Sequence, residues 1–260
     1  MGRGSTFRLR IWGRKKLWRL LVICEIMGRS NSHKDILKPL TWSYSSINTF
    51  KQCPKKYYHT RVIKDTPEPT SQAMLYGKQV HKAAEDYVRD GKPIQEAFLY
   101  IKEFIDGILA SFKGEVLCEH RLGITEDLEP CGFFDDKVWY RGIVDLLIID
   151  KENKQAVIID YKTGKNPQYA DVNQLELMTL AVFKHFPEVE NVKAGLYFFT
   201  KTQLIKETYD KTKEPDLWAK WLEQVNELKS CYDNDVWNPK PNFSCSRFCP
   251  VESCEHNGRY

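Results

Sequence analysis

Apolar residues recur with a helical period in several parts of the chain. This pattern predicts four long helices, over residues 73–90, 94–112, 171–186 and 215–232. Gly91 and Pro93 end the first of them, because neither residue favours the continuation of a helix. A short helix is expected to begin at Ser43 or Ser45, since both are good N-cap residues, and Pro54 interrupts it.

Five further segments are rich in β-branched and aromatic residues, which favour strands. They cover residues 115–124, 138–150, 155–164, 192–200 and 203–210. The turn-forming sequence DKENK, residues 150–154, separates the second and third of these segments. Helices that enclose a central mixed sheet make the predicted fold α/β or α+β.

The composition is that of an ordinary folded chain. It has 260 residues, of which 28% are charged and 42% hydrophobic, and this length suffices for one large core or two modest ones. The balance excludes collagen-like, low-complexity and mostly disordered proteins. No window offers the roughly 18 consecutive apolar residues that a membrane span needs, so we expect no membrane partner.

Positive charge is concentrated at the N-terminus. The formal net charge is +4, but residues 1–26 hold seven lysines and arginines against one glutamate, a balance of +6, so the remaining residues sum to −2. A nucleic-acid partner must therefore be held by a local patch. Residues 1–40 are predicted to be a basic leader outside the core, with Met27 as an alternative start. We expect a cytoplasmic location, or a mitochondrial one if residues 1–26 act as a presequence.

Two carboxylates interrupt apolar strand segments. Asp145 lies inside GIVDLLII, and Asp160 ends AVIID. An unpartnered carboxylate in such surroundings is costly or stays protonated. If the DKENK turn places Asp150 opposite Gln155, Asp145 faces Asp160, and the two charges repel unless something positive lies between them.

A lysine follows the second carboxylate at strand spacing. Alternation along the strand puts Lys162 on the same face as Asp160 and turns Tyr161 away. Hard oxygen ligands around one point suit Mg²⁺ or Mn²⁺, which polarises a phosphoryl oxygen and lowers the pKa of bound water. From the residues alone, the alternative is a structural salt bridge of Lys162 with Asp160 or Asp145 at the sheet edge.

Five segments, in order along the chain, resemble the motifs of a known enzyme family. GIVD (142–145) and the D-Y-K of residues 160–162 resemble motifs II and III of the PD-(D/E)XK nuclease superfamily. Motifs of its RecB-like branch, which includes exonuclease V, AddB and the CRISPR-associated RecB-like exonucleases, resemble SYSSINTFKQCPKKYY (43–58), GKQVHKAAE (77–85) and NQLELM (173–178). The resemblance implies a restriction-endonuclease-like core over residues 41–243.

The resemblance also implies roles for individual residues. Asp145, Asp160 and the backbone carbonyl of Tyr161 would bind Mg²⁺ or Mn²⁺. His81 would be a further metal ligand, reaching in from its helix, and Lys162 would be the catalytic lysine. From the residues alone, an inward-facing histidine is also typical of a hydrogen-bonded core position.

Two more site positions follow from the resemblance. Gln174 would support Lys162 or contact the DNA backbone. The family often has a tyrosine four residues later, where this chain has Met178, so that contact is not carried over. The family has an acidic residue near the first core strand, and Glu119 is the candidate for it, with Glu115 as a competitor. Either glutamate can instead be an ordinary exposed strand residue.

Cysteines are clustered at the C-terminus, which indicates a metal. Cys245, Cys249 and Cys254 form C-x3-C-x4-C within the last sixteen residues. Iron–sulfur members of the branch have a lone cysteine near the N-terminus and three near the C-terminus, commonly C-x2-C-x5-C, so the middle cysteine of this chain is shifted by one position. The resemblance implies that Cys53 completes a [4Fe–4S] cluster with the segment 244–260. Zinc, with Cys53 or His256 as the fourth ligand, is the alternative, and unmetalled thiols are another. Packing or surface positions are expected for the remaining cysteines, Cys24, Cys118, Cys131 and Cys231.

A basic and aromatic segment follows Cys53. Lys55, Lys56, Tyr57 and Arg61, extended by Lys165, are candidates for DNA contact, because cations and stackable rings suit a single strand. An ordinary solvated surface is the alternative.

The predicted function is a Mg²⁺- or Mn²⁺-dependent DNA nuclease, acting as an exonuclease on single-stranded DNA ends in repair, recombination or replication. The chain has no G-x-x-x-x-G-K-(S/T) motif, so it needs existing ends or a helicase or recombination partner. A structure-specific endonuclease is one alternative. A non-catalytic DNA-binding subunit of a helicase–nuclease assembly is the other.

Overall fold

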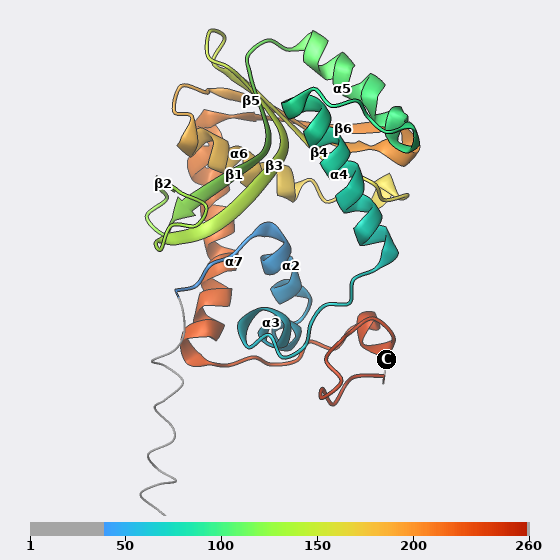
Figure 1. Cartoon of the computed structure of the whole chain (residues 1–260). Helices are drawn as coiled ribbons and strands as arrows, with labels where there is room; N and C mark the ends of the chain where they lie inside the picture. Colours follow the sequence, from blue (N-terminus) through green and yellow to red (C-terminus); the bar gives the residue numbers. More distant parts are fainter. Residues whose placement is uncertain (1–38, 259–260) are drawn as a thin grey trace, which may run out of the picture. The chain divides into compact units, whose positions relative to one another are not determined.

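A six-stranded mixed sheet lies at the centre of the unit formed by Leu40–Tyr260 (Figure 1). The computed structural model describes residues 39–258, so the predictions for residues 1–26 lie outside it. The strand order is β2-β1-β3-β4-β5-β6; β4 and β5 pair in parallel, and the other neighbours pair antiparallel. The strands are β1 (Glu115–Thr125), β2 (Pro130–Cys131), β3 (Val138–Asp150), β4 (Gln155–Lys162), β5 (Asn191–Phe198) and β6 (Gln203–Asp210).

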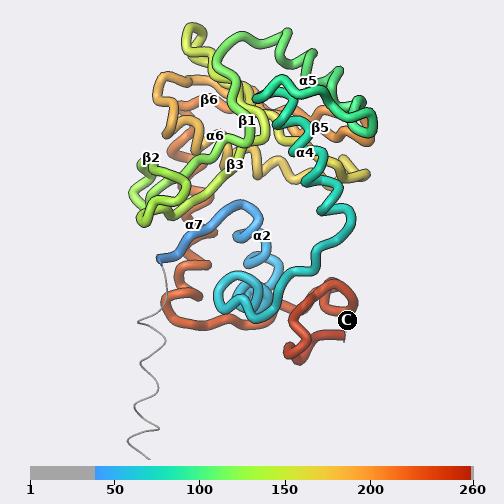
Figure 2. Tube along the Cα trace, in the orientation of Figure 1, coloured from blue at the N-terminus to red at the C-terminus, as the bar shows by residue number. Residues whose placement is uncertain are grey.

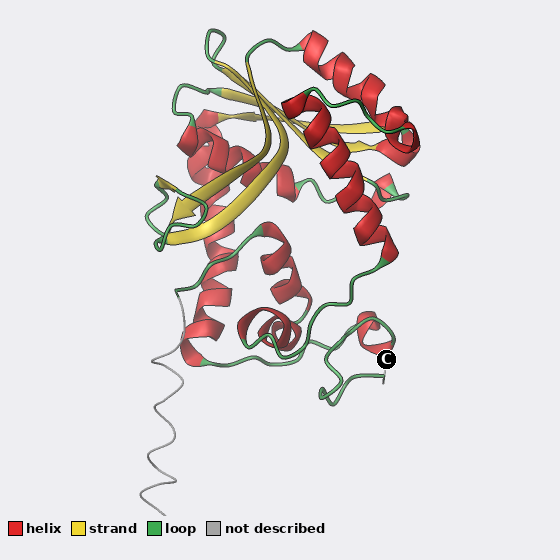
Figure 3. Cartoon of the chain, viewed as in Figure 1, coloured by secondary structure: helices red, strands yellow, loops and turns green. Residues whose placement is uncertain are grey.

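Helices cover both faces of this sheet, as Figure 3 shows. They are α2 (Tyr44–Gln52), α3 (Pro54–Tyr57), α4 (Gln72–Asp90), α5 (Leu99–Ser111), α6 (Asn173–His185) and α7 (Glu214–Asn234). A π-helical turn spans Tyr58–Val62, and short 3-10 turns span Glu96–Phe98, Pro167–Tyr169, Phe199–Lys201, Lys211–Lys213 and Phe243–Ser246. The predicted fold class is confirmed: this is an α/β fold with a mixed sheet flanked by helices. Within residues 39–258, no helix combines the length and apolarity of a membrane span.

Burial on both faces explains the continuous apolar runs of β3 and β4. Leu147 and Ile158 belong to a core shared with α2, α6 and α7, whereas Leu146 and Ile159 belong to a second core shared with α4 and α5. Successive residues of a strand point to opposite faces, so a strand that is buried on both sides is apolar throughout. Asp145 and Asp160 are therefore exceptional in this sheet.

The register predicted for β3 and β4 is confirmed where the strands pair. Asp150 lies opposite Gln155, and the ladder continues to the pair of Leu146 and Ile159. It ends one position before Asp145 and Asp160, where the two strands separate. The carboxylates thus lie at the point where the sheet opens.

The predicted helices and strands match the observed ones to within a few residues, with three differences. The helix expected over 94–112 is broken near Phe98, whose side chain is buried and whose backbone leaves helical geometry, so α5 begins at Leu99. The α3 helix and the π turn that follow Pro54 were not predicted. Neither was the two-residue strand β2.

The chain segment before α2 is fixed against the start of β3. Trp42 is 1% exposed and packs on Trp139, Tyr140 and Trp221. Its N–H donates to Trp139 O at 2.8 Å, and its carbonyl accepts from Arg141 N at 2.9 Å. Ser43 then caps α2, as predicted, by accepting from Ser46 N. This anchoring sets one wall of a groove described below.

The segment after α7 returns to the N-terminal helices, as the tube in Figure 2 shows. Asn242 Nδ2 donates to Gln52 O at 3.2 Å, and Lys240 Nζ donates to Lys51 O at 3.0 Å. Residues about 190 positions apart in the sequence are thus in contact. The boundary between a nuclease domain ending at 243 and a cysteine segment 244–260 stays a prediction.

Candidate active site

The edge of β1 is distorted opposite Asp145. Cys118 pairs with Leu146 and His120 with Val144, but the ladder has no pair at Glu119 and Asp145 between them. Glu119 has a φ of 46°, in the left-handed region that a non-glycine residue rarely adopts. Such outliers are held in place by the surrounding structure and concentrate at functional sites. Here the distortion brings the Glu119 carboxylate toward α4.

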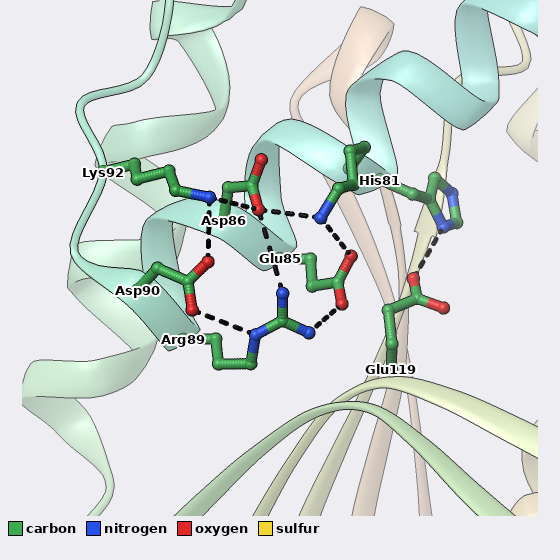
Figure 4. Close-up of polar contacts among 8 residues, drawn as sticks. His81, Glu85, Asp86, Arg89, Asp90, Lys92 and Glu119 are labelled. Carbon is green, nitrogen blue, oxygen red and sulfur yellow. Dashed lines mark hydrogen bonds and ion pairs between the residues drawn. The ribbon is translucent and has the colours of Figure 1, made fainter.

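His81 reaches this point from α4. A Cβ at Gly77, one turn earlier, would meet Thr163 Oγ1 at 3.3 Å, so the glycine lets α4 approach the end of β4 closely. His81 Nδ1 lies 3.2 Å from Asp145 Oδ1 and 3.7 Å from Glu119 Oε1. Figure 4 shows the contact between His81 and Glu119. The ligand atoms of His81, Glu119 and Asp145 lie within 4.8 Å of one another.

Both ring nitrogens of His81 face oxygen acceptors. Nε2 lies 3.0 Å from Tyr161 O, and Nδ1 faces the carboxylates of Asp145 and Glu119. Burial lowers the pKa of His81, but the hydrogen bonds with the Asp145 and Glu119 carboxylates outweigh it and raise the pKa to about 10. The ring is therefore an imidazolium at neutral pH, and a metal at this point would replace its proton.

A second cluster lies beside the first, around Asp160. Lys162 Nζ is 2.6 Å from Asp160 Oδ2 and donates to Gln174 Oε1 at 2.8 Å. Gln174 Nε2, from the first turn of α6, donates to Asp160 Oδ1 at 2.6 Å. Lys162 thus lies on the same face of β4 as Asp160, as predicted, and Gln174 contacts both side chains.

Tyr161 connects the two clusters through its backbone. Its N–H donates to Asp145 Oδ2 at 2.6 Å, and its carbonyl lies against His81. Its side chain packs in the core that the sheet shares with α4 and α5. Burial, and then the negative charge of Asp145, raise the pKa of Asp160 to about 6, although the Lys162 ammonium acts against them. The charge of Asp145 on β3 therefore acts on Asp160 on β4.

The donor set fits a divalent cation. Two carboxylates and an imidazole converge, and carboxylate oxygens suit Mg²⁺ and Mn²⁺ while imidazole is compatible with the softer ions. Asp160 Oδ2 is buried, and within residues 39–258 its one close polar partner is the Lys162 ammonium. A cation beside these acids would offset their mutual repulsion, which the apolar sheet does not.

Comparisons with known proteins agree with this geometry. A family model described as the PD-(D/E)XK nuclease superfamily matches residues 41–114 and 110–254. The chain belongs to this superfamily. Membership implies a hydrolase that acts on nucleic acid with the help of divalent metal ions.

Similarity to individual proteins is low. The solved structure named SSO0001 is 13% identical, with a TM-score of 0.36, and the match covers 94% of this chain and 98% of that one. A "Putative exonuclease" from Eubacterium rectale is 12% identical, with a TM-score of 0.47, over 80% of this chain and 86% of that one. A search of curated proteins finds no match. The family assignment therefore rests on the family model.

Charged residues along α4 support the helix that carries His81 in this nuclease. Lys82 pairs with Glu85 and Asp86. Arg89 pairs with Glu85 and Asp90, as Figure 4 shows. Pairs at a spacing of three or four residues stabilise a helix, although exposed ones contribute little each. Glu85 is thus held by helix neighbours, in the way expected for a surface acid.

Two hollows flank the carboxylates. One, of about 610 Å³, is lined by His81 and Glu119 together with residues of α4. The other, of about 690 Å³, lies between the start of α2 and the start of β3, and Gln174 is part of its lining. The first hollow thus reaches the site at His81 and Glu119, and the second reaches it at Gln174, which contacts Asp160. Arg141 and Phe133 line the second hollow and were not predicted; the sequence signal is the arginine directly before GIVD.

The four cysteines named from the resemblance line one cavity. Cys53 comes from the junction of α2 and α3, and Cys245, Cys249 and Cys254 come from the C-terminal segment. Lys240 N donates to Cys53 Sγ at 3.4 Å, and Asn242 N donates to Cys245 Sγ at 3.5 Å. Two of the four sulfurs are thus positioned by backbone N–H groups of the segment that follows α7.

Several side chains of the basic segment after Cys53 have partners within the protein. Lys55 pairs with Glu255 at 2.6 Å, and Arg61 pairs with Glu68 at 3.0 Å. Tyr57 is 3% exposed and packs between Phe50 and Trp237. Its ring has no free face, so the expectation that it stacks on a DNA base is corrected. Lys56 lines the cysteine cavity, and Lys165 is exposed in the loop after β4.

Glu115 does not compete with Glu119 for the site. It lies at the other end of β1, where its carboxylate is 3.7 Å from Lys151 Nζ. The acid that the structure brings to His81 is Glu119.

Proposed function

We propose that the protein is a Mg²⁺- or Mn²⁺-dependent DNA nuclease that removes nucleotides from single-stranded ends. One observation carries the nuclease assignment in a chain of this superfamily. The His81, Glu119 and Asp145 group lies directly beside the Asp160, Lys162 and Gln174 group.

The first group would hold the cation. Asp145 and Glu119 offer carboxylate oxygens and His81 offers Nδ1, with Asp160 as the acid of the neighbouring group. A bound divalent ion polarises a phosphoryl oxygen and lowers the pKa of its water. The Tyr161 carbonyl, which lies against His81, is the backbone group proposed to join them.

The second group would hold the reacting atoms. Lys162 is about one-third exposed and presents its ammonium next to Asp160, where it can orient a water molecule or stabilise charge on the phosphate. Gln174 fixes Lys162 by accepting from its Nζ. These residues act as one unit, so the loss of any member should reduce the rate strongly.

The cysteine cavity is proposed to hold a [4Fe–4S] cluster that ties the two ends of the described chain together. Three lysines, Lys55, Lys56 and Lys240, line the same cavity, and their positive charge suits four thiolates that hold an anionic cluster.

The test of the nuclease assignment is Asp160→Ala. It should abolish Mg²⁺-dependent cleavage of a labelled oligonucleotide and leave binding in EDTA intact, because Asp160 is one of the acids proposed to surround the metal ion. Glu152→Ala, in the exposed β3–β4 turn, is the control and should cleave normally. Unchanged cleavage by Asp160→Ala would place the active site elsewhere, and a wild-type protein that binds without cleaving would favour the non-catalytic subunit.

Linear and circular single strands separate the exonuclease from an endonuclease. An exonuclease needs an end and should degrade the linear strand alone, whereas cleavage of the circle would favour the structure-specific endonuclease. Anaerobic purification followed by a visible spectrum and an iron assay tests the cluster; a colourless protein containing zinc would overturn it.

A further inference from the structure

Two arginines and two phenylalanines form a cluster beside the groove that leads to Gln174. Arg121 on β1 and Arg141 on β3 each lie over both Phe133 and Phe134, with guanidinium carbons 5.4 to 5.8 Å from the ring centroids. The two rings meet edge to face at 5.0 Å. Residues from two strands and the turn between them are thus assembled into one surface.

Neither guanidinium is neutralised by the described part of the chain. Arg121 and Arg141 form no ion pair within residues 39–258, and Arg141 Nε is buried without a hydrogen-bond partner there. Two acids, Asp135 and Asp136, directly follow Phe134, and Asp135 accepts from Lys137 N within its own turn. Like charges repel and a buried donor without an acceptor is unfavourable, so an anion bound here would offset both costs.

The rings provide a stacking surface. Phe134 is 72% exposed, although phenylalanine is normally buried, and Phe133 is part of the groove lining. Cations behind an aromatic ring fix its orientation, so the exposed faces are held ready for a partner. A flat ring beside an unneutralised guanidinium matches the alternation of base and phosphate in a nucleic-acid strand.

The opposite wall of the groove is polar. Ser43, Ser45 and Asn48, from the first turns of α2, line the same hollow of about 690 Å³. The first turn of this helix has no acidic residue, so its positive end is not neutralised locally. Gln174, which touches Asp160, is also in the lining. The hollow therefore extends from Arg141 and Phe133 of the cluster to Gln174, the hydrogen-bond partner of Asp160.

We propose that this groove holds the single-stranded part of the substrate, with Arg121 and Arg141 binding phosphate and Phe133 and Phe134 stacking a base. This deepens the proposed function and rests on it. A single strand is the occupant because its bases have free faces, whereas the faces of duplex bases are covered by their neighbours. Guanidiniums bind phosphate in any sequence, so the groove confers little sequence preference.

Binding without cleavage tests the groove. Fluorescence anisotropy with a fluorescein-labelled oligothymidine in EDTA should show about tenfold weaker binding for Arg141→Ala, with a salt slope lower by about 0.7, the value for one lost phosphate contact on a single strand. Phe134→Ala should weaken binding roughly fivefold or more with the slope unchanged. Lys206→Ala, an exposed lysine on the edge strand β6, is the control and should bind within about twofold of wild type.

The outcomes separate this proposal from the nuclease assignment. If Arg141→Ala and Phe134→Ala bind like wild type while the wild type cleaves DNA, the groove proposal is wrong and the nuclease stands. If these variants lose binding but Asp160→Ala cleaves normally, the groove stands and the assigned active site is wrong. Phe134 is exposed, so its variant should fold even if Arg141→Ala does not. Photocrosslinking with bromodeoxyuridine should map to residues 131–142 in the wild type, and crosslinks confined to other segments would overturn the proposal.

Discussion

At the scale of single residues, the site is a balance between buried acids and the cations around them. Asp160 is 3% exposed and senses Asp145, so its carboxyl holds its proton to a higher pH than an ordinary aspartate does. The nearby carboxylates also raise the pKa of His81, to about 10, so its ring keeps its proton at neutral pH. A divalent ion bound here would favour the deprotonated forms of both groups.

The pKa of Asp160 predicts an unusual pH dependence of stability. The pKa of Asp160 is raised from 3.8 to about 6 in the folded protein, so ionisation of this carboxyl favours the unfolded state. The metal-free protein therefore loses stability as the pH rises between these two values. Asp160→Asn should therefore be more stable than wild type at pH 7 in EDTA, by up to about 3 kcal/mol, and the gain should vanish near pH 4. Thermal unfolding across this pH range measures the effect.

The control for this prediction has the opposite sign. Asp150, on the same strand as Asp145, has a lowered pKa because Asn153 donates to its carboxylate. Asp150→Asn should therefore reduce stability at neutral pH. Mn²⁺ should raise the melting temperature of the wild type but not that of Asp160→Asn. An Asp160→Asn variant that is less stable than wild type at pH 7 would contradict the argument.

Glu119 and Glu115 form a matched pair on one strand. Glu119→Gln should weaken Mn²⁺ binding by roughly ten- to a hundredfold, because it removes a charge from the group with His81 and Asp145. Glu115→Gln should leave binding unchanged, since that residue lies at the far end of β1. Isothermal titration calorimetry with Mn²⁺ compares them, and equal loss in both variants would show that Glu119 acts only through general charge.

The sequence predicted part of this site, and the reason differs from residue to residue. Asp145, Asp160 and Lys162 were predictable because strand alternation and a short turn fix their relation locally. The position of Glu119 depends on a left-handed backbone at one residue and on the pairing of β1 with β3, which no local pattern reveals. The burial of Tyr57 likewise depends on Trp237, which is remote in sequence.

At the scale of elements, α6 has to be held so that Gln174 stays beside Asp160. Glu176, one half-turn further, is 8% exposed and accepts from Trp221 Nε1 at 2.6 Å and from Lys220 Nζ at 2.9 Å, both on α7. This buried group fixes α6 on α7. The periodicity of α6 identified it as a helix but did not indicate that a buried acid joins it to α7.

Removal of this buried acid should destabilise the fold and disturb the site. Glu176→Ala leaves the buried Trp221 Nε1 without its acceptor, at a cost of about 1–3 kcal/mol, whereas Lys220 Nζ keeps its bond to Asn173 Oδ1. Glu223→Ala, an exposed position on α7, should change stability by less than about 0.5 kcal/mol. Urea unfolding measures both, and equal stability of the two variants would show that the Glu176 contacts contribute nothing.

At the scale of the whole unit, the sheet positions the acidic residues of the site, and the cysteine segment connects the C-terminal part of the chain to the N-terminal helices. The sheet opens at the carboxylates between two hollows, while the C-terminal segment returns to the α2–α3 junction. Three of the four cysteines that line the cavity form a compact motif at one end of the chain, whereas Cys53 was named only from the family resemblance. The sequence did not predict the groove, because Arg121, Phe133 and Arg141 meet only when β1 and β3 pair.

The proposed cluster should stabilise the fold by closing a loop of about 190 residues between Cys53 and Cys245. By the chain-entropy argument used for disulfides, a closure of this length contributes at most about 5 kcal/mol. Cys53→Ser should lose iron and visible absorbance, and its melting temperature should fall, because one attachment of the N-terminal helices is removed. Cys231→Ser, half-buried on α7 and outside the cavity, is the control and should keep both. Full iron content and an unchanged melting temperature in Cys53→Ser would show that the two ends of the chain are held by packing alone.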